Sequence, residues 1–478
     1  MLIWFVIVYL IVSIGIGLYA STKVKNSTDY VVAGRHLPLP FIIATVFATW
    51  FGSETVLGIP AKFLNDGLSG VIADPFGSSM CLIFVGLFFA RPLYRMKLLT
   101  IGDYYRGRYS RTVEVVTSLC IVISYLGWVS AQITALGLVF SVLTGGAISP
   151  ALGMVLGVAI VLVYTLAGGM FSVAFTDLFQ MVIIALGMIY IGFVVSGIAG
   201  GAGTVIDHAH AAGKFEFWPK PEAREIIGFV AAWATMALGS IPQQDVFQRV
   251  SAAKNEQTAG LGSVLGGVIY FGFAFVPMFL AYSALLIDPR MVGDLIQKDS
   301  QYILPTLILN HAPFATQVIF FGALLAAILS CSSATLLAPS VTFAENILRA
   351  FFPRISDHQF LRMLRIVVFL FALSVLAFSL LSNSTIYGMV ESAYKITLVA
   401  AFTPLAFGLY WKRATNQGAV FALAAGLGTW VALEVYNPAG FMPPQFAGLL
   451  ASMTGMAIGS LLPQRIVARS AHPRHGTG

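Results

Sequence analysis

The chain has 478 residues, of which 58% are hydrophobic and only 10% are charged. Soluble domains contain about 45–50% apolar and 25% charged residues, so this composition excludes a soluble globular protein and favours a chain that crosses a membrane repeatedly. The net charge of +7 comes from basic residues in short loops between apolar stretches, so no nucleic-acid-binding domain is expected.

The first apolar stretch, residues 2–20, is predicted to stay in the mature protein as a membrane helix. It has no basic segment before it and no small-residue cleavage site, unlike a signal peptide. Apolar stretches of about 20 residues, enough to span a bilayer, recur almost to Pro463. Together with turn residues and loop charges they predict about thirteen spans in one all-α membrane domain. The spans are residues 2–21, 40–65, 70–92, 112–143, 148–168, 172–198, 225–250, 259–286, 315–348, 362–381, 385–411, 416–436 and 444–463.

The loops between these spans divide by charge. Loops rich in lysine and arginine face the cytoplasm, and the other loops hold few basic residues. This pattern predicts a multi-pass cell-membrane protein with its N-terminus outside and its C-terminus in the cytoplasm. The basic set is Lys23, Lys25, Arg35, Arg91, Arg95, Lys97, Arg106, Arg108, Arg111, Arg249, Lys254, Arg349, Arg354, Arg362, Arg365, Lys412, Arg413, Arg465, Arg469 and Arg474.

Cysteine and histidine give no sign of a metal cluster or a proton relay. The three cysteines, Cys81, Cys120 and Cys331, lie in apolar segments and suggest no disulfide framework. No histidine falls within a predicted span, which argues against a histidine relay. Because the spans also lack a pairing of nucleophile and base, the chain is not expected to be an enzyme.

Few ionisable residues remain inside the spans. Each costs at least about 2.5–3.5 kcal/mol when ionised at mid-bilayer, so each is a candidate for function. Glu391 and Lys395 are four residues apart and are expected to neutralise each other on one helix face. The complete set is Glu54, Asp74, Asp177, Asp245, Glu391 and Lys395.

Two spans contain helix-breaking residues at membrane depth. The second carries Gly52, Ser53 and Glu54 among small and hydroxylated residues, and the seventh carries Pro242, which removes a backbone donor. Paired broken helices point to the binding site of a transporter, although each alone could be an ordinary kink.

The two broken spans are five apart and run in opposite directions by the charge rule. This spacing is the pattern of two inverted five-helix repeats. We place the first repeat at residues 38–200 and the second at 223–413, followed by C-terminal helices and a tail at 414–478.

The ninth span contains the hydroxyl-rich segment Ala326–Thr335. Sodium prefers oxygen ligands, and hydroxyls together with the free carbonyls of an unwound helix supply them. Serine and threonine also let helices pack closely, which is the alternative interpretation.

The most specific motif is Tyr164–Gln180, read as YTLAGGMFSVAFTDLFQ. It resembles the signature of the sodium/solute symporter family, which includes proline, sugar, pantothenate and choline carriers. Further similarities are Gly34-Arg35, Ala48-Thr49-Trp50 and Thr100–Asp103, and they extend over nearly the whole chain. The resemblance implies an amino-acid-transporter-type core of two inverted repeats with a sodium site between spans 2 and 9.

The sodium ligands implied by the resemblance come from both spans. The expected second hydroxyl falls on a cysteine, whose thiol is a poor ligand for a hard cation. An oxygen of Ser332, Ser333 or Asp177 could substitute, and Asp177 matches the acidic residue near which the ion is released. The implied set is the carbonyls of Ala48, Phe51 and Ala327, the side chain of Ser330, Cys331, and Asp177.

The solute site is implied where spans 2, 3, 4, 7 and 11 meet, and the chain looks most like the choline-carrier branch there. Trp50 and Trp128 occupy two positions of a cage that holds a quaternary ammonium through cation–π attraction. The other two cage positions fall on Ser78 and Gln243, so choline is not the expected solute. The implied solute-binding set is Trp50, Glu54, Asp74, Ser78, Trp128, Ser240 and Gln243.

Glu54 and Asp74 favour a cationic or zwitterionic solute, such as an amine or an amino acid like proline, unless Lys62 pairs with one of them. The expected function is therefore sodium-coupled symport of a small polar organic solute by alternating access. Proton coupling through Asp177 or Glu54, or a sensor of the same fold, are the alternatives. The expected partners are the solute, the sodium ion and the lipid bilayer, with the chain a monomer or a loose homo-oligomer.

Overall fold

The computed structural model describes residues 2–382 and 384–466. Those residues form helices and loops without a strand, and an isolated β-bridge joins Leu37 to Ala253. Nine of the described helices are long and apolar enough to cross a membrane, or up to ten if one bent pair is a single span. The all-α membrane class is thus confirmed, and the count of about thirteen spans stays a prediction. The basic residues Arg469 and Arg474 lie outside the described residues.

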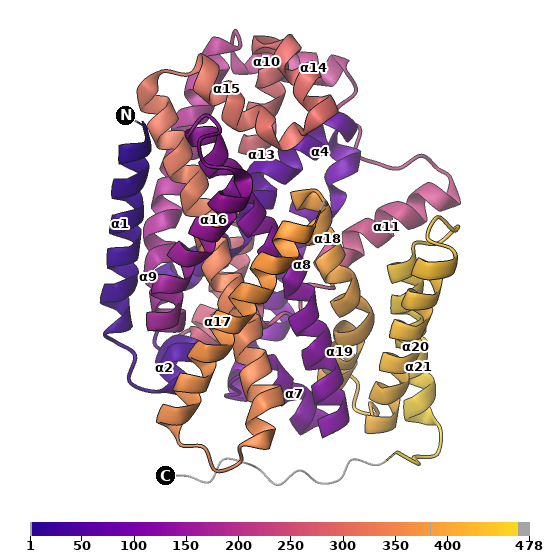
Figure 1. Cartoon of the computed structure of the whole chain (residues 1–478). Coiled ribbons are helices and arrows are strands. Elements are labelled where there is room, and N and C mark those ends of the chain that lie inside the picture. Colours follow the sequence, from indigo (N-terminus) through magenta and orange to yellow (C-terminus); the bar gives the residue numbers. More distant parts are fainter. Residues whose placement is uncertain (1, 383, 467–478) are drawn as a thin grey trace.

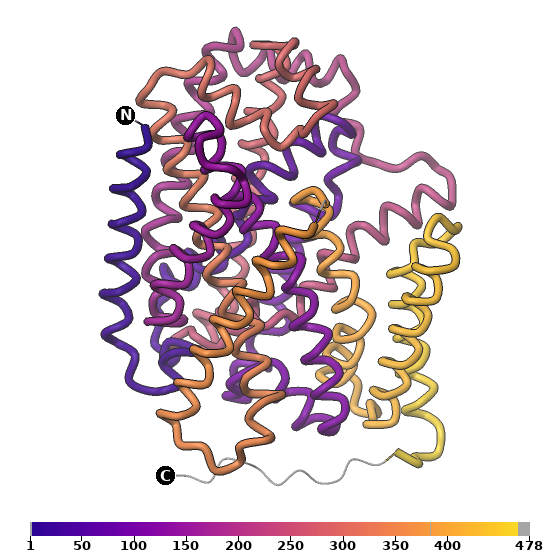
Figure 2. Tube along the Cα trace, in the orientation of Figure 1, coloured from indigo at the N-terminus to yellow at the C-terminus, as the bar shows by residue number. Residues whose placement is uncertain are grey.

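The helices pack side by side in a bundle (Figure 1). Its first half contains α1 (Leu2–Ser21), α2 (Ser27–Val32), α3 (Leu39–Trp50), α4 (Ile59–Asp66), α5 (Ser78–Phe84), α6 (Ala90–Arg95), α7 (Ile101–Arg108), α8 (Arg111–Leu143), α9 (Pro150–Ile198) and α10 (Ala202–Ala211). Its second half contains α11 (Ala223–Ala237), α12 (Gln244–Ala252), α13 (Glu256–Ile287), α14 (Pro289–Lys298), α15 (Ile303–His311), α16 (Phe314–Thr342), α17 (Asp357–Leu381), α18 (Ile386–Thr397), α19 (Thr403–Tyr410), α20 (Asn416–Tyr436) and α21 (Pro444–Leu461). The tube in Figure 2 places α1 and the α20–α21 hairpin at opposite edges of the bundle.

The predicted spans 148–168 and 172–198 form one long element, α9, which is kinked at Gly169. Gly169 has φ of 49°, in the left-handed region that favours glycine. A Cβ at this position would lie 2.3 Å from the carbonyl oxygen of Tyr30. The Tyr30 hydroxyl in turn donates to the carbonyl of Thr165, at 3.0 Å. The glycine pair of the signature motif is therefore the bend that lets α2 pack against α9.

Both predicted helix interruptions are confirmed. After α3 ends, the segments Leu39–Trp50 and Glu54–Asp66 meet at a bend of 52°. In the seventh span, α11 and α12 are separated by residues 238–243, which include Pro242. Each break exposes backbone groups inside the bundle, where they need partners other than lipid.

One end of the bundle is closed by α7 and the end of the ninth span. The Thr100 hydroxyl donates to Asn346 Oδ1 at 2.8 Å, and Asn346 Nδ2 donates to Glu114 at 3.0 Å. Arg108 donates to the carbonyls of Gly408 and Ala414. The charge rule predicts that this end faces the cytoplasm.

The opposite end, where α10, α14 and α15 gather (Figure 1), is also covered. Lys214 Nζ donates to the carbonyl of Leu64 at 2.7 Å, and the Ile386 amide donates to Gln301 at 2.9 Å. A Cβ on Gly58 would lie 3.2 Å from the backbone of Tyr387, so the second and eleventh spans are in close contact. The centre of the bundle is therefore shielded from both ends.

Replacing Gly169 by alanine should destabilise the protein by about 1–3 kcal/mol, because the left-handed backbone and the Tyr30 carbonyl both oppose a Cβ. Gly192→Ala is the matched control, since its Cβ would meet only Val276 at an ordinary 3.7 Å. Thermal unfolding in detergent measures the difference. Equal melting temperatures for the two variants would contradict the role assigned to this bend.

Candidate binding site

The break in the second span changes the partners of two backbone amides. The Gly52 amide donates to the carbonyl of Trp50 at 3.0 Å, and the Ser53 amide donates to Gln132 Oε1 at 2.9 Å. In a continuous helix these amides would bond to the carbonyls of Ala48 and Thr49, four residues back. The break thus releases carbonyl oxygens toward the interior of the bundle.

Gln132, on α8, holds both sides of this break. Its Oε1 accepts the Ser53 amide, and its Nε2 donates to Glu54 Oε2 at 2.7 Å. Both Gln132 and Glu54 are buried. Gln132 was not predicted as a site residue, and its signal in the sequence is a polar amide in the middle of an apolar span.

The ninth span meets the break at Gly52. A Cβ on Gly52 would lie 2.8 Å from Cys331 Sγ and 2.9 Å from both Gln132 and Glu54. Next to Cys331, the Ser330 hydroxyl donates to Asp177 Oδ1 at 2.5 Å, and Asp177 Oδ2 has no hydrogen-bond partner. The break, α16 and α9 therefore come together as the resemblance implied.

This donor set suits sodium better than a transition metal. Among residues 2–382 and 384–466, no group of three or more His, Cys, Asp or Glu side chains could hold a metal ion. The oxygens at hand are the carbonyls near the break, from Ala48 and Phe51, and the Ser330 hydroxyl. Ala327 lies one turn before Ser330 on the same helix. Oxygen donors of this kind are those a hard cation prefers.

Asp74 is a further buried acidic residue near the second span. It lies on non-helical backbone, with φ −138° and ψ 121°, and accepts hydrogen bonds from the hydroxyls of Ser78 and, at 2.5 Å, Tyr270. Tyr270 also lies 3.2 Å from the Thr55 hydroxyl, which links Asp74 to the second span. The suggested pairing of Lys62 with Glu54 or Asp74 is wrong. The Lys62 ammonium instead pairs with the carboxylate of Asp66, at 2.6 Å.

Three aromatic rings lie beside the break. The Trp50 and Trp128 ring centroids are 5.6 Å apart, and Tyr394 lies 5.9 Å from Trp50 and 5.4 Å from Trp128. All three are buried, and the Tyr394 hydroxyl has no hydrogen-bond partner. The two tryptophans were predicted to lie at the site, whereas Tyr394 was not recognised.

The break in the seventh span supplies polar groups on the facing side. Gln243 Nε2 donates to the Ser124 hydroxyl at 3.0 Å, and the Thr397 hydroxyl donates to the carbonyl of Gly239 at 2.7 Å. Ser240 is buried, and its hydroxyl has no partner. Gln243 therefore joins the break to α8. The resemblance implied an aromatic ring of a quaternary-ammonium cage at this position.

The placement of Arg249 in a cytoplasmic loop is wrong. Arg249 lies on α12 and is only 2% exposed, because the break at Pro242 turns α12 into the bundle. Its Nη1 donates to the carbonyl of Asp245 at 3.1 Å, and the Asp245 carboxylate accepts the Tyr125 hydroxyl. A cation thus lies buried on the second half of the interrupted seventh span.

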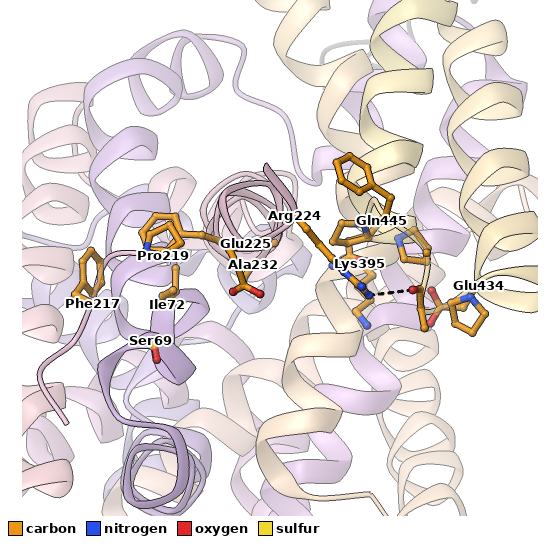
Figure 3. Close-up of a pocket in the computed structure, with 18 residues that line it drawn as sticks. Ser69, Ile72, Phe217, Pro219, Arg224, Glu225, Ala232, Lys395, Glu434 and Gln445 are labelled. Carbon is orange, nitrogen blue, oxygen red and sulfur yellow. Dashed lines mark hydrogen bonds between the residues drawn. The ribbon is translucent and has the colours of Figure 1, made fainter. Parts of the chain in front are cut away.

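The expected pairing of Glu391 with Lys395 is also wrong. No ion pair joins them within the described part of the chain, and Lys395 lines a lateral cavity. That cavity, shown in Figure 3, lies beside α11 and the α20–α21 hairpin. Its lining includes none of the predicted site residues.

A Gly52→Ala substitution should abolish most of the stabilisation by sodium, because its Cβ would displace Cys331, Gln132 or Glu54 from the break. The measurement is the shift of melting temperature with rising NaCl against KCl. Gly272→Ala is the control, since nothing lies within 4 Å of its Cβ. A normal sodium response in Gly52→Ala would show that the ion binds elsewhere.

Comparisons with known proteins agree with this architecture. A solved structure of a Na⁺-coupled sialic acid symporter, in a substrate-bound outward-open state, matches with a TM-score of 0.83 at 20% identity. The match covers 98% of this chain and 99% of that one. The nucleobase-cation-symport-1 family transporter Mhp1, in a closed conformation, matches with a TM-score of 0.59 at 15% identity, over 91% and 96% of the two chains. These likenesses show the fold.

Sequence relatives are more informative about the family. The human high affinity choline transporter 1 is 27% identical over 88% of this chain and 75% of its own length. The osmoregulated proline transporter OpuE of Bacillus subtilis is 28% identical over 93% of both chains. The model of the sodium:solute symporter family matches residues 30–426. The chain therefore belongs to the sodium:solute symporter family and is a multi-pass membrane transporter, not an enzyme, with sodium as its coupling ion.

Proposed function

We propose that the transported solute is a small cationic or zwitterionic molecule, an amine or an amino acid, carried with sodium by alternating access. The observation that carries this proposal is a pair of buried carboxylates near one break. Glu54 lies at the break of the second span next to the rings of Trp50, Trp128 and Tyr394, and Asp74 is linked to that span through Tyr270 and Thr55. Neither carboxylate has an ion pair with a cationic side chain in the part of the chain that the structure describes.

Charge balance favours a positive solute. A buried carboxylate that is ionised and unpaired costs several kcal/mol, and hydrogen bonds from Gln132 and Tyr270 offset only part of this. A solute ammonium group would neutralise the charge, while the faces of Trp50 and Trp128 attract it through cation–π interaction. The choline and proline transporters among the relatives both act on solutes with a positively charged nitrogen.

The polar replacements in the cage favour a solute with N–H groups over a quaternary ammonium. Ser78 is bound to Asp74, and Gln243 is bound to Ser124, so neither presents an aromatic face. Carboxylate and amide oxygens accept hydrogen bonds, which a primary or secondary ammonium can donate and a quaternary one cannot. An amino acid such as proline fits this chemistry better than choline.

We place sodium at the break of the second span, with the carbonyls of Ala48, Phe51 and Ala327 and the hydroxyl of Ser330 as ligands. Cys331 lies next to the break but offers only a weak sulfur ligand. Asp177, which accepts the Ser330 hydrogen bond, would attract the ion during release. Sodium couples to the solute if it binds one conformation more tightly than the other.

The same proposal includes the arrangement of the chain in the membrane. Two inverted repeats, residues 38–200 and 223–413, each begin near an interrupted span, and the remaining residues 414–478 follow them in one domain. The N-terminus lies outside and the C-terminus in the cytoplasm. The basic loops support this orientation.

Uptake into proteoliposomes tests the proposed function. Purified protein should accumulate radiolabelled proline, or another amine or amino acid of a small panel, under an inward sodium gradient and not under a potassium gradient. Choline, a sugar and a carboxylate without an amine are the comparison solutes. Accumulation of the sugar or the plain carboxylate alone would contradict the cationic or zwitterionic assignment.

Ser330→Ala should raise the sodium concentration for half-maximal uptake about tenfold, because one oxygen ligand is lost. Cys331→Ser should leave this concentration equal or lower it, because a hydroxyl replaces a thiol at the second position. Each variant changes a single side-chain atom of the unaltered protein, and the two positions are neighbours in the sequence. Each variant is therefore a control for the other. Loss of uptake in well-folded Cys331→Ser would contradict the assigned geometry.

Glu54→Gln should weaken solute binding more strongly than sodium binding. The substitution removes the negative charge of the carboxylate and keeps a polar side chain of the same size. The measurement is the concentration of solute and of sodium for half-maximal uptake, each at saturation of the other. Asp66→Asn is the control, since Asp66 is an exposed acid paired with Lys62. An unchanged solute affinity in Glu54→Gln would remove Glu54 from the solute site.

A further inference from the structure

Lys395 stands apart from the transport site. It lies on α18 within the candidate membrane span Ile386–Tyr410, and its side-chain ammonium makes no hydrogen bond or ion pair in the described residues. A charged residue at membrane depth is costly unless it faces a polar cavity or a partner. Lys395 lines a cavity of about 530 Å³ between the bundle and the α20–α21 hairpin (Figure 3).

A second cation reaches the same cavity from another helix. Arg224, in the first turn of α11, extends toward Lys395 and Glu434 in Figure 3 and donates to the carbonyl of Ala439 at 3.1 Å. No carboxylate lies within ion-pair distance of Arg224 or Lys395 in the described residues. Two cations that converge without a paired carboxylate favour an anionic group between them.

The start of α21 adds N–H groups that can donate hydrogen bonds to an anion. Pro444 and Gln445 line the cavity at the N-terminus of this 18-residue helix. The Phe446 and Ala447 amides donate to the carbonyl of Pro443 and Pro444 has no amide hydrogen, so the Gln445 backbone amide is the free donor of this first turn. The Gln445 side chain is 6% exposed and has no hydrogen-bond partner in the described residues. A helix N-terminus favours an anion, and the buried amide supplies an N–H donor to it.

The cavity also carries an acidic group and an apolar, aromatic mouth. Glu434, on α20, forms no ion pair and can face a cationic group of the ligand. Glu225 projects from a different side of α11 (Figure 3). Phe441, which lines the cavity at its mouth, is 60% exposed, as is typical of aromatic residues at the membrane–water interface.

We propose that this cavity binds the headgroup of a zwitterionic phospholipid. The phosphate lies between Arg224, Lys395 and the N-terminus of α21, and the ammonium group faces Glu434. The acyl chains leave past the aromatic mouth into the bilayer. The bound lipid then bridges the transport core to the α20–α21 hairpin, with Arg224 already bonded to the loop at Ala439.

Native mass spectrometry of the full chain, released from nanodiscs with equal phosphatidylethanolamine and phosphatidylglycerol of matched acyl chains, tests this proposal. The unaltered protein should retain one phosphatidylethanolamine. The double variant Arg224→Gln, Lys395→Gln should retain at least about tenfold less, because the charged partners of the phosphate are lost. Lys220→Gln, which removes a charge from the adjoining loop outside the cavity lining, should behave like the unaltered protein.

Glu434→Gln separates the two charges of the headgroup. The total amount of bound phospholipid should stay the same in this variant. The ratio of retained phosphatidylethanolamine to retained phosphatidylglycerol should fall toward one. Equal retention of phosphatidylethanolamine by the double variant and the unaltered protein would overturn the proposal, as would a preference of the unaltered protein for phosphatidylglycerol. Melting temperature and its response to sodium, measured on each variant, show that the fold is intact.

A further arm distinguishes a lipid from a free solute. Soluble phosphoethanolamine, added to delipidated protein, should shift the melting temperature only weakly because it lacks acyl chains. A strong shift without retention of phosphatidylethanolamine would assign the cavity to a soluble zwitterion and overturn the lipid assignment. Arg224→Gln alone should leave sodium-dependent uptake intact, so this test can fail independently of the proposed transport function.

Discussion

The interruption of the second span is the constraint on which the rest of the site depends. A backbone break inside a bilayer is tolerated only if protein groups satisfy the released amides and carbonyls. Gln132 does this from α8, since it accepts the Ser53 amide and donates to Glu54. In the proposed site, the same break opens carbonyls for sodium and directs Glu54 toward the solute, so that ion and solute binding depend on one local geometry.

Coupling follows from this shared geometry. Gly52 lies in contact range of Cys331, Gln132 and Glu54, so a shift of α16 toward or away from the break changes both sites together. Ser330 links the break to Asp177 on α9, beyond the bend at Gly169. Movement of the ion toward Asp177 would therefore act on α9 and α16 together.

The sequence predicted what is encoded locally and missed what needs spatial neighbours. Gly52-Ser53-Glu54 and Pro242 marked the two breaks, because glycine and proline act on their own backbone. Tyr394 and Tyr270 were missed, since buried tyrosines in apolar spans look like packing residues until their hydroxyls are seen. The fold brings these residues together, and their roles as ligands of sodium and solute are proposals.

The errors have one physical cause. Lys62, Arg249 and Lys395 were assigned by their distance along the chain from acids or loops. The contacts of each side chain depend on its direction and on the packing around its helix. Lys62 pairs with Asp66 one turn along α4, Arg249 is buried on α12, and Lys395 lines the lateral cavity.

The central claim is that sodium lies at the break of the second span, held by carbonyls of α3 and by α16. Cryo-electron microscopy of the protein in sodium chloride and in potassium chloride tests it most directly. The account predicts sodium-dependent density within about 2.3–2.6 Å of oxygens of Ala48, Phe51, Ala327 and Ser330. Density absent from this position, or present only between Glu54 and Asp74, would contradict it.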